Sequence, residues 1–195
     1  APRYAHRAFM IDIARNFRGV DYLKSLVDQL AAYKMSTLHL HLSDDEGWRL
    51  EIPGLPELTE VGGRRGHTLD ERDRLLAQLG SGPGAPAGQD ERTYLTRDEY
   101  VDLVRHAANR GIDVMPEVDM PGHSRAAVMA MESRYHRLRA AGLSEAGAFA
   151  MTIGPDSCER DPYKLAPGLC GCGWEDLDLQ LYSMRRRGGT EYFRR

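Results

Sequence analysis

The chain has 195 residues, of which 42% are hydrophobic and 28% are charged, and its formal net charge is -3 at pH 7. This length allows one domain with a hydrophobic core or part of a larger one, and the composition is typical of globular proteins. The slight negative charge argues against a nucleic-acid-binding surface, and no apolar run approaches the ~20 residues of a membrane-spanning helix. The chain starts at Ala1 with no signal peptide, which we expect of a piece of a longer precursor.

Strand and helix patterns alternate along the first 142 residues. Apolar and β-prone runs predict buried strands at residues 6–14, 36–42 and 112–118. Apolar residues with helical spacing predict a helix around residues 23–31, and helices over 96–111 and 124–142 each end at a glycine. Thr96 and Glu99 form a capping-box pattern at the start of the middle helix. This order predicts βαβ units on a parallel sheet.

The fold class is therefore α/β, and two architectures fit it. Three strands are too few to close a barrel, and the chain is shorter than the ~250 residues of a complete (β/α)8 barrel. It is either a small open α/β domain or the first part of a barrel. Residues 44–95 separate the second strand from its helix, far beyond the usual ~2–6 residues, and include the glycine- and proline-rich stretch 80–88, for which we predict flexibility.

Polar side chains collect where the predicted strands end. Because the carboxyl ends of parallel strands meet in one crevice, we expect a site there. Arg7 lies at the start of the first strand pattern. Asp12 and Arg15 lie towards the end of the first strand, Asp44 and Asp45 follow the second, and the third ends in Glu117, Asp119 and His123. Two adjacent carboxylates repel each other, so Asp44 and Asp45 require a cation, a proton or a ligand.

Two chemistries fit these residues. A metal-dependent barrel hydrolase would use the His-x-His pair His39 and His41. Carbohydrate chemistry would use the carboxylates, an arginine and an aromatic platform such as Trp48. Cys158, Cys170 and Cys172 carry only a weak metal or disulfide pattern, and we interpret them as incidental thiols.

Two long segments carry a resemblance to a known family. "HLHLSDDEGWRLEIPGLPELTEVGG" (39–63) and "GIDVMPEVDMPGHSRAAVMAMESRY" (111–135) resemble glycoside hydrolase family 20, the β-N-acetylhexosaminidases, and in particular its bacterial chitobiase branch. "HRAFMIDIARNF" (6–17) is similar to the family's first barrel strand. The resemblance implies a partial (β/α)8 TIM barrel made of the first three βα units. Residues 1–155 would be the N-terminal part of the catalytic barrel, followed by an unassigned, divergent tail over 156–195.

The resemblance also implies roles for the polar residues. Asp44 and His123 would form a charge-coupled pair beside the general acid. Substrate would be bound by Arg7, Asp45 and Trp48, and structural support would come from Asp12, Glu117 and Asp119. The implied reaction is substrate-assisted, retaining hydrolysis of terminal N-acetylhexosamine from β-glycosides such as chitobiose, without cofactor or metal. The implied partner is an N-acetylhexosamine-containing glycan, with no nucleic acid or membrane, and secreted, periplasmic and lysosomal locations all fit the family.

The family's His-x-Gly-Gly-Asp-Glu motif, which supplies the acid and the residue that orients the acetamido group, is absent from the sequence. The nearest string is "RRGGTE" (186–191), in which only Glu191 could act as the acid. We therefore expect a fragment that is inactive on its own. The metal-dependent hydrolase and a non-catalytic sugar-binding remnant stay open as alternatives.

Overall fold

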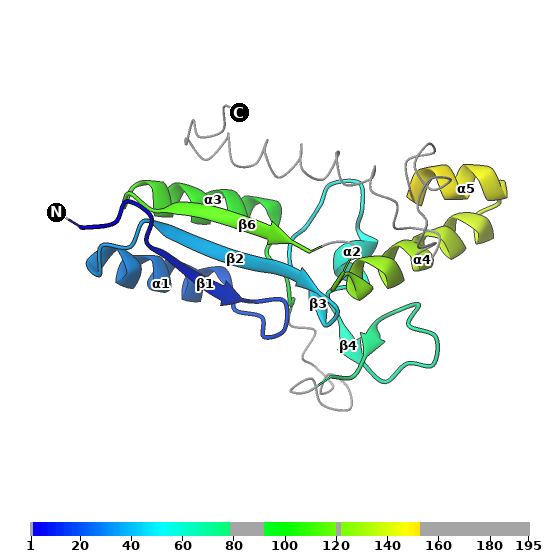
Figure 1. Cartoon of the computed structure of the whole chain (residues 1–195). Coiled ribbons are helices and arrows are strands. Elements are labelled where there is room, and N and C mark those ends of the chain that lie inside the picture. Colours follow the sequence, from blue (N-terminus) through cyan, green and yellow to red (C-terminus); the bar gives the residue numbers. More distant parts are fainter. Residues whose placement is uncertain (1, 79–91, 120–121, 153–195) are drawn as a thin grey trace.

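The computed structural model describes residues 2–78, 92–119 and 122–152. Its centre is a parallel sheet in which β2 (Thr37–Asp44) lies between β1 (Ala8–Asp12) and β6 (Asp113–Val118) (Figure 1). The short strand β3 (Gly47–Trp48) turns back antiparallel against the end of β2. The three predicted strands and their parallel pairing are confirmed, and β2 extends beyond its predicted end to Asp44.

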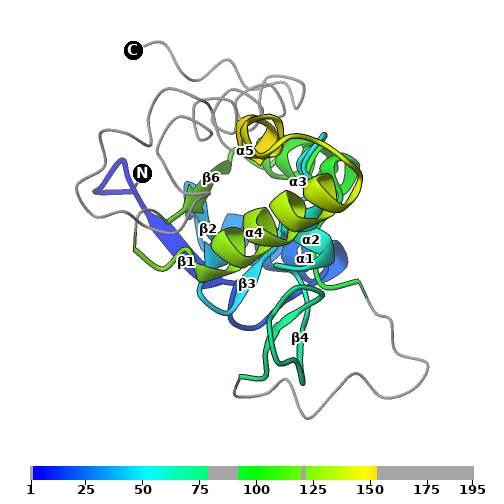
Figure 2. The same ribbon diagram turned by 90° about the vertical axis from the view of Figure 1, so that its right-hand side faces the viewer.

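Helices α1 (Val20–Ala32) and α3 (Arg97–Ala108) pack side by side on one face of this sheet (Figures 1 and 2). Successive side chains of a strand point to opposite faces, so Leu38, Leu40 and Leu42 of β2 enter the core between sheet and helices. The predicted capping box is confirmed, because the Thr96 hydroxyl accepts a hydrogen bond from the backbone N–H of Glu99 and the Glu99 carboxylate accepts one from that of Thr96.

The long segment after β2 is built of short elements in its described part, residues 44–78 and 92–95. It contains α2 (Glu57–Glu60) and the two-residue strands β4 (Arg65–Gly66) and β5 (Leu75–Leu76), which pair parallel to each other. The stretch 80–88, predicted to be flexible, lies outside the described residues.

Helix α4 (Arg125–Ala140) follows β6 and lies beyond the carboxyl ends of the strands, where it packs against α2 (Figure 2). Helix α5 (Glu145–Thr152) packs against α4. Within the described residues, no helix combines the length and the apolar character needed to cross a membrane. The tail 156–195, with Cys158, Cys170, Cys172 and Glu191, lies outside the described residues.

Candidate active site

The register of the sheet places three polar side chains in one row. Asp12 of β1 is paired with His41 of β2, and His41 is paired with Glu117 of β6. His39 lies two residues before His41, so it shares the same sheet face, opposite the leucines of the core. Both imidazoles contact Glu117, which places them on this one face.

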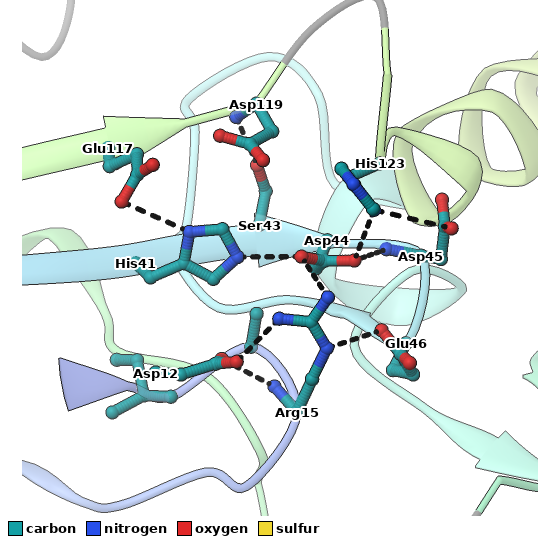
Figure 3. A network of polar contacts seen from close by, with 12 residues as sticks. Asp12, Arg15, His41, Ser43, Asp44, Asp45, Glu46, Glu117, Asp119 and His123 are labelled. Atoms are coloured by element: carbon teal, nitrogen blue, oxygen red, sulfur yellow. Dashed lines mark hydrogen bonds and ion pairs between the residues drawn. The ribbon is translucent and has the colours of Figure 1, made fainter.

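Asp44 is the centre of the polar cluster, and its side chain is only 1% exposed. Its Oδ2 lies 2.7 Å from Nε2 of His41 and 2.7 Å from Nη2 of Arg15. Its Oδ1 accepts a hydrogen bond from the backbone N–H of Asp45 and lies 3.4 Å from Nδ1 of His123 (Figure 3). The predicted proximity of Asp44 and His123 is confirmed. The basic side chains of Arg15, His41 and His123 offset the negative charge with which the strand ends.

Buried charges in this cluster have shifted pKa values. Burial alone raises the pKa of Asp44, but the hydrogen bonds from His41 and from the backbone of Asp45 outweigh it and hold that pKa below its ordinary value. Burial alone lowers the pKa of His41, yet hydrogen bonds to Asp44 and Glu117 raise it above its ordinary value. Burial raises the pKa of Asp119, and repulsion from Glu117 adds to this shift.

The arginine of this site is Arg15, and the prediction for Arg7 is wrong. Arg7 precedes β1, at the end of the sheet opposite Asp44, where its guanidinium donates to the carbonyls of Tyr4, Ala5 and Lys34. Arg15 follows the carboxyl end of β1 and contacts Asp12, Asp44 and Glu46. Its side chain is 44% exposed, so the guanidinium is held by carboxylates and still open to a ligand. The rule that the site lies after the strand ends would have selected it.

Asp12, Glu117 and Asp119 were predicted to give structural support. Asp12 holds Arg15, accepting hydrogen bonds from its backbone and its side chain. Glu117 contacts the imidazoles of His39 and His41 on the neighbouring strand β2. The backbone N–H of Asp119 donates to the hydroxyl of Ser43, which ties the end of β6 to β2.

Asp45 and His123 lie at the start of α4. The Asp45 carboxylate accepts a hydrogen bond from the backbone N–H of Arg125, the first residue of this helix. His123 has a backbone φ of +53° and a side chain that is 60% exposed. A positive φ is unfavourable for a residue with a Cβ, so the fold holds His123 in a strained conformation that places its ring beside Asp44.

Trp48 is a core residue, and its predicted role as a sugar platform is wrong. The side chain is 1% exposed, and its indole N–H donates to the carbonyl of Leu50 at 2.6 Å. The alternation within the β3 hairpin directs this ring inward, among the buried residues of the core. A ring without an exposed face cannot stack on a ligand.

Replacing Trp48 by Phe is therefore expected to lower the free energy of unfolding by about 1–3 kcal/mol, because the buried carbonyl of Leu50 loses its donor. Urea unfolding followed by circular dichroism measures the change. A variant as stable as the original chain would show that the indole N–H contributes nothing, contrary to its buried position.

Arg49 is a buried cation that the sequence did not reveal. Its side chain has an exposure of 1%, and its guanidinium donates to five backbone carbonyls, those of Ile13, Ala14, Glu46, Gly63 and Thr93. Burial lowers its pKa to about 9, with repulsion from Arg65 adding to the shift, so Arg49 stays charged at pH 7. It joins the end of β1, the β3 hairpin and the long segment behind Arg15.

In the part of the chain that the structure describes, two groups of side chains bring ligand atoms close enough for one cation: His41, Asp44 and Asp119, and Asp44, Asp45 and His123. In the first group, both ring nitrogens of His41 already face carboxylates. Neither group contains His39, so the geometry does not favour the predicted His39 and His41 metal pair. Both groups are explained without a metal by the ion pairs described above.

The shifted pKa values predict how stability depends on pH. The contribution of His41 is complete below its ordinary pKa of 6.5 and is lost as the pH rises through its higher folded-state pKa. Asp44 and Glu117 stabilise the fold above their ordinary pKa values of 3.8 and 4.5. Their contribution to stability is lost as the pH falls through their lower folded-state pKa values. We expect the cluster to stabilise the fold most between pH 4.5 and 6.5. Urea unfolding across pH would contradict this if stability rose steadily above pH 8.

The model of the family described as "Glycosyl hydrolase family 20, catalytic domain" matches residues 4–159. The chain therefore belongs to glycosyl hydrolase family 20.

Its relatives include the N,N'-diacetylchitobiase of Vibrio harveyi, 54% identical over 142 residues, which are 73% of this chain and 16% of that protein. Beta-hexosaminidase B of Pseudoalteromonas piscicida is 48% identical over 144 residues, 74% of this chain and 18% of that protein. A solved GH20 exo-β-N-acetylglucosaminidase from Vibrio harveyi, in complex with N-acetylglucosamine, superposes with a TM-score of 0.56 at 41% identity, covering 68% of this chain and 19% of that one. The chain thus spans less than a fifth of the length of these relatives.

Proposed function

We propose that this chain forms the N-terminal part of the catalytic domain of a β-N-acetylhexosaminidase, which hydrolyses terminal non-reducing N-acetylhexosamine from β-glycosides. The observation that carries the proposal is the buried carboxylate of Asp44, joined to Arg15, His41 and His123 at the carboxyl ends of the strands. Family membership and relatives named as chitobiase and beta-hexosaminidase support the same activity.

In this proposal Arg15 takes the role first predicted for Arg7. Asp12, Asp44 and Glu46 fix its guanidinium, which keeps donors for sugar hydroxyls on its exposed side. Asp44 and His123 act as a charge-coupled pair that orients the general acid and adjusts its pKa. Asp45 contributes by holding the start of α4, and its carboxylate, 47% exposed, remains a proposed substrate contact.

We further propose that residues 1–155 make the first three βα units of a (β/α)8 barrel. Three features support this: the parallel pairing of β1, β2 and β6, helices on one sheet face, and the polar row on the other. Among the described residues β1 pairs only with β2, and its apolar Phe9 and Met10 are 43% and 53% exposed, as expected of a strand that a further strand would cover.

The 195-residue chain alone is proposed to be inactive, because its sequence contains no His-x-Gly-Gly-Asp-Glu motif. A sugar-binding remnant stays the second candidate, since the Arg15 and Asp44 pair forms without that motif. Two assays on the purified chain separate these readings. A chromogenic β-N-acetylglucosaminide should give no turnover, and turnover abolished by Glu191→Gln would contradict this. Calorimetric titration with N-acetylglucosamine would show binding only for the remnant.

The proposed function itself is tested in a chimera. In Vibrio harveyi N,N'-diacetylchitobiase, the 142-residue region that matches this chain is exchanged for the corresponding residues of this chain. This chitobiase chimera should release the chromophore from a β-N-acetylglucosaminide. Circular dichroism and the intact chitobiase serve as controls for folding and for the assay.

A further inference from the structure

Acidic and basic side chains alternate along the polar face of the sheet. His39 Nε2 lies 2.6 Å from Oε2 of Glu117, and the same oxygen lies 3.1 Å from Nδ1 of His41. The other ring nitrogen of His41, Nε2, lies 2.7 Å from Oδ2 of Asp44, whose Oδ1 faces His123. This series of contacts runs from the middle of β2 to the loop that precedes α4, and Figure 3 shows its part from Glu117 through His41 and Asp44 to His123.

His41 is the central residue of this series of contacts, because it lies between Glu117 and Asp44. It is the most buried of the seven histidines, with a side chain that is 7% exposed. A neutral imidazole has one N–H and one lone pair. With a carboxylate at each nitrogen, the neutral ring would point its lone pair at one of them, a repulsive contact in a buried place. The imidazolium instead places a positive charge between both carboxylates and avoids this cost.

The charges around His41 favour the same state. Glu117 and Asp119 approach from β6, Asp44 lies on the same strand as His41 and His39, and Asp12 lies across on β1. The opposing positive charge is Arg15, on the far side of Asp44. Carboxylates therefore outnumber the fixed cations near the ring, and a positive charge on His41 is stabilised.

We propose that His41 is a positioning residue held as an imidazolium, which keeps Asp44 ionised and fixes its Oδ2. Arg15 and His41 together occupy that oxygen, so Oδ1 is the atom left to face His123. Glu117 anchors the other side of the ring and thereby couples β6 to Asp44. The consequence for catalysis rests on the proposed function of this site, whereas the charge state and its effect on Asp44 do not.

The test is nuclear magnetic resonance on the full 195-residue chain, without any sugar. At pH 7.5, nitrogen-15 spectra should show both ring nitrogens of His41 protonated. In the Glu117→Gln variant the pKa of His41 should fall, because one of its two carboxylates is gone. A His41 with a single N–H at pH 7.5 in the original chain would overturn the proposal, whatever the enzyme assays give.

The pKa of Asp44 tests the positioning role of His41. In a His41→Gln variant, carboxyl carbon-13 titration should show the pKa of Asp44 raised by about 1 unit or more, because an adjacent positive charge is lost. The control is His106→Gln, which removes a half-buried histidine of α3 that pairs with Asp28 at 2.8 Å on the other face of the fold. The His106→Gln variant should leave the pKa of Asp44 unchanged. An Asp44 titration that is the same in all three proteins would mean that His41 only fills space. If His41→Gln does not fold, Glu117→Gln still decides the charge state.

Discussion

Replacing Asp44 by Asn in the chitobiase chimera is expected to lower kcat/KM by about 100-fold or more, the loss that accompanies a misplaced catalytic constellation. The neutral amide cannot offset Arg15 and His41 together, and both contact the same oxygen of Asp44 at 2.7 Å. The carboxylate that faces His123 is lost in the same step. Initial rates with a chromogenic β-N-acetylglucosaminide measure the effect.

The matched control for Asp44→Asn is Asp102→Asn on α3. Asp102 also pairs with a cation, Lys24, but its side chain is 52% exposed. Exposed pairs of this kind contribute about 0–1 kcal/mol to stability. Asp102 lies on α3, away from the strand ends that form the site. This variant should keep the activity of the chimera. An Asp44→Asn chimera that turns over substrate as fast as the Asp102→Asn chimera would remove Asp44 from the proposed mechanism.

Replacing Arg49 by Met in the 195-residue chain is expected to lower the free energy of unfolding by about 3–5 kcal/mol, the scale of removing one partner of a buried charged network. Methionine fills part of the space but removes the guanidinium that donates to carbonyls of three chain segments. Arg49→Lys should recover part of the loss, since the ammonium keeps the charge and some donors. Urea unfolding by circular dichroism gives the values.

The control for Arg49 is Arg105→Met, at a side chain of α3 that is 55% exposed. Exposed substitutions of this kind change stability by about 0.5 kcal/mol or less. If Arg49→Met costs no more than Arg105→Met, the guanidinium does not organise the backbone behind Arg15. A loss of similar size in Arg49→Lys and Arg49→Met would instead show that the fork of donors, not the charge, carries the stability.

Local patterns in the sequence predicted most of the fold. The leucines of β2 alternate with two histidines, and the Thr96 and Glu99 cap begins α3, because strand period and helix capping are set by neighbouring residues. The segment after β2 was read as one long loop because α2, β4 and β5 are too short to produce a periodic pattern.

The site was predicted less completely, because its geometry depends on contacts between distant residues. The pair Asp44 and His123 was implied by the family resemblance, whereas the meeting of strand ends predicted only that both residues lie near one crevice. Arg7 was chosen over Arg15 although only Arg15 lies at the correct end of β1. Trp48 next to acidic residues is consistent in sequence with a sugar platform, and Arg49 carried no signal there. Only the packing of the β3 hairpin shows that both are buried.

If these residues work as part of a β-N-acetylhexosaminidase barrel, the chitobiase chimera should turn over substrate. The measurement is the rate of chromophore release from a β-N-acetylglucosaminide, compared with intact Vibrio harveyi N,N'-diacetylchitobiase and with the Asp44→Asn chimera. We expect turnover well above that of the Asp44→Asn chimera. A folded chimera that releases no more chromophore than the substrate in buffer, while the intact enzyme is active, would contradict it.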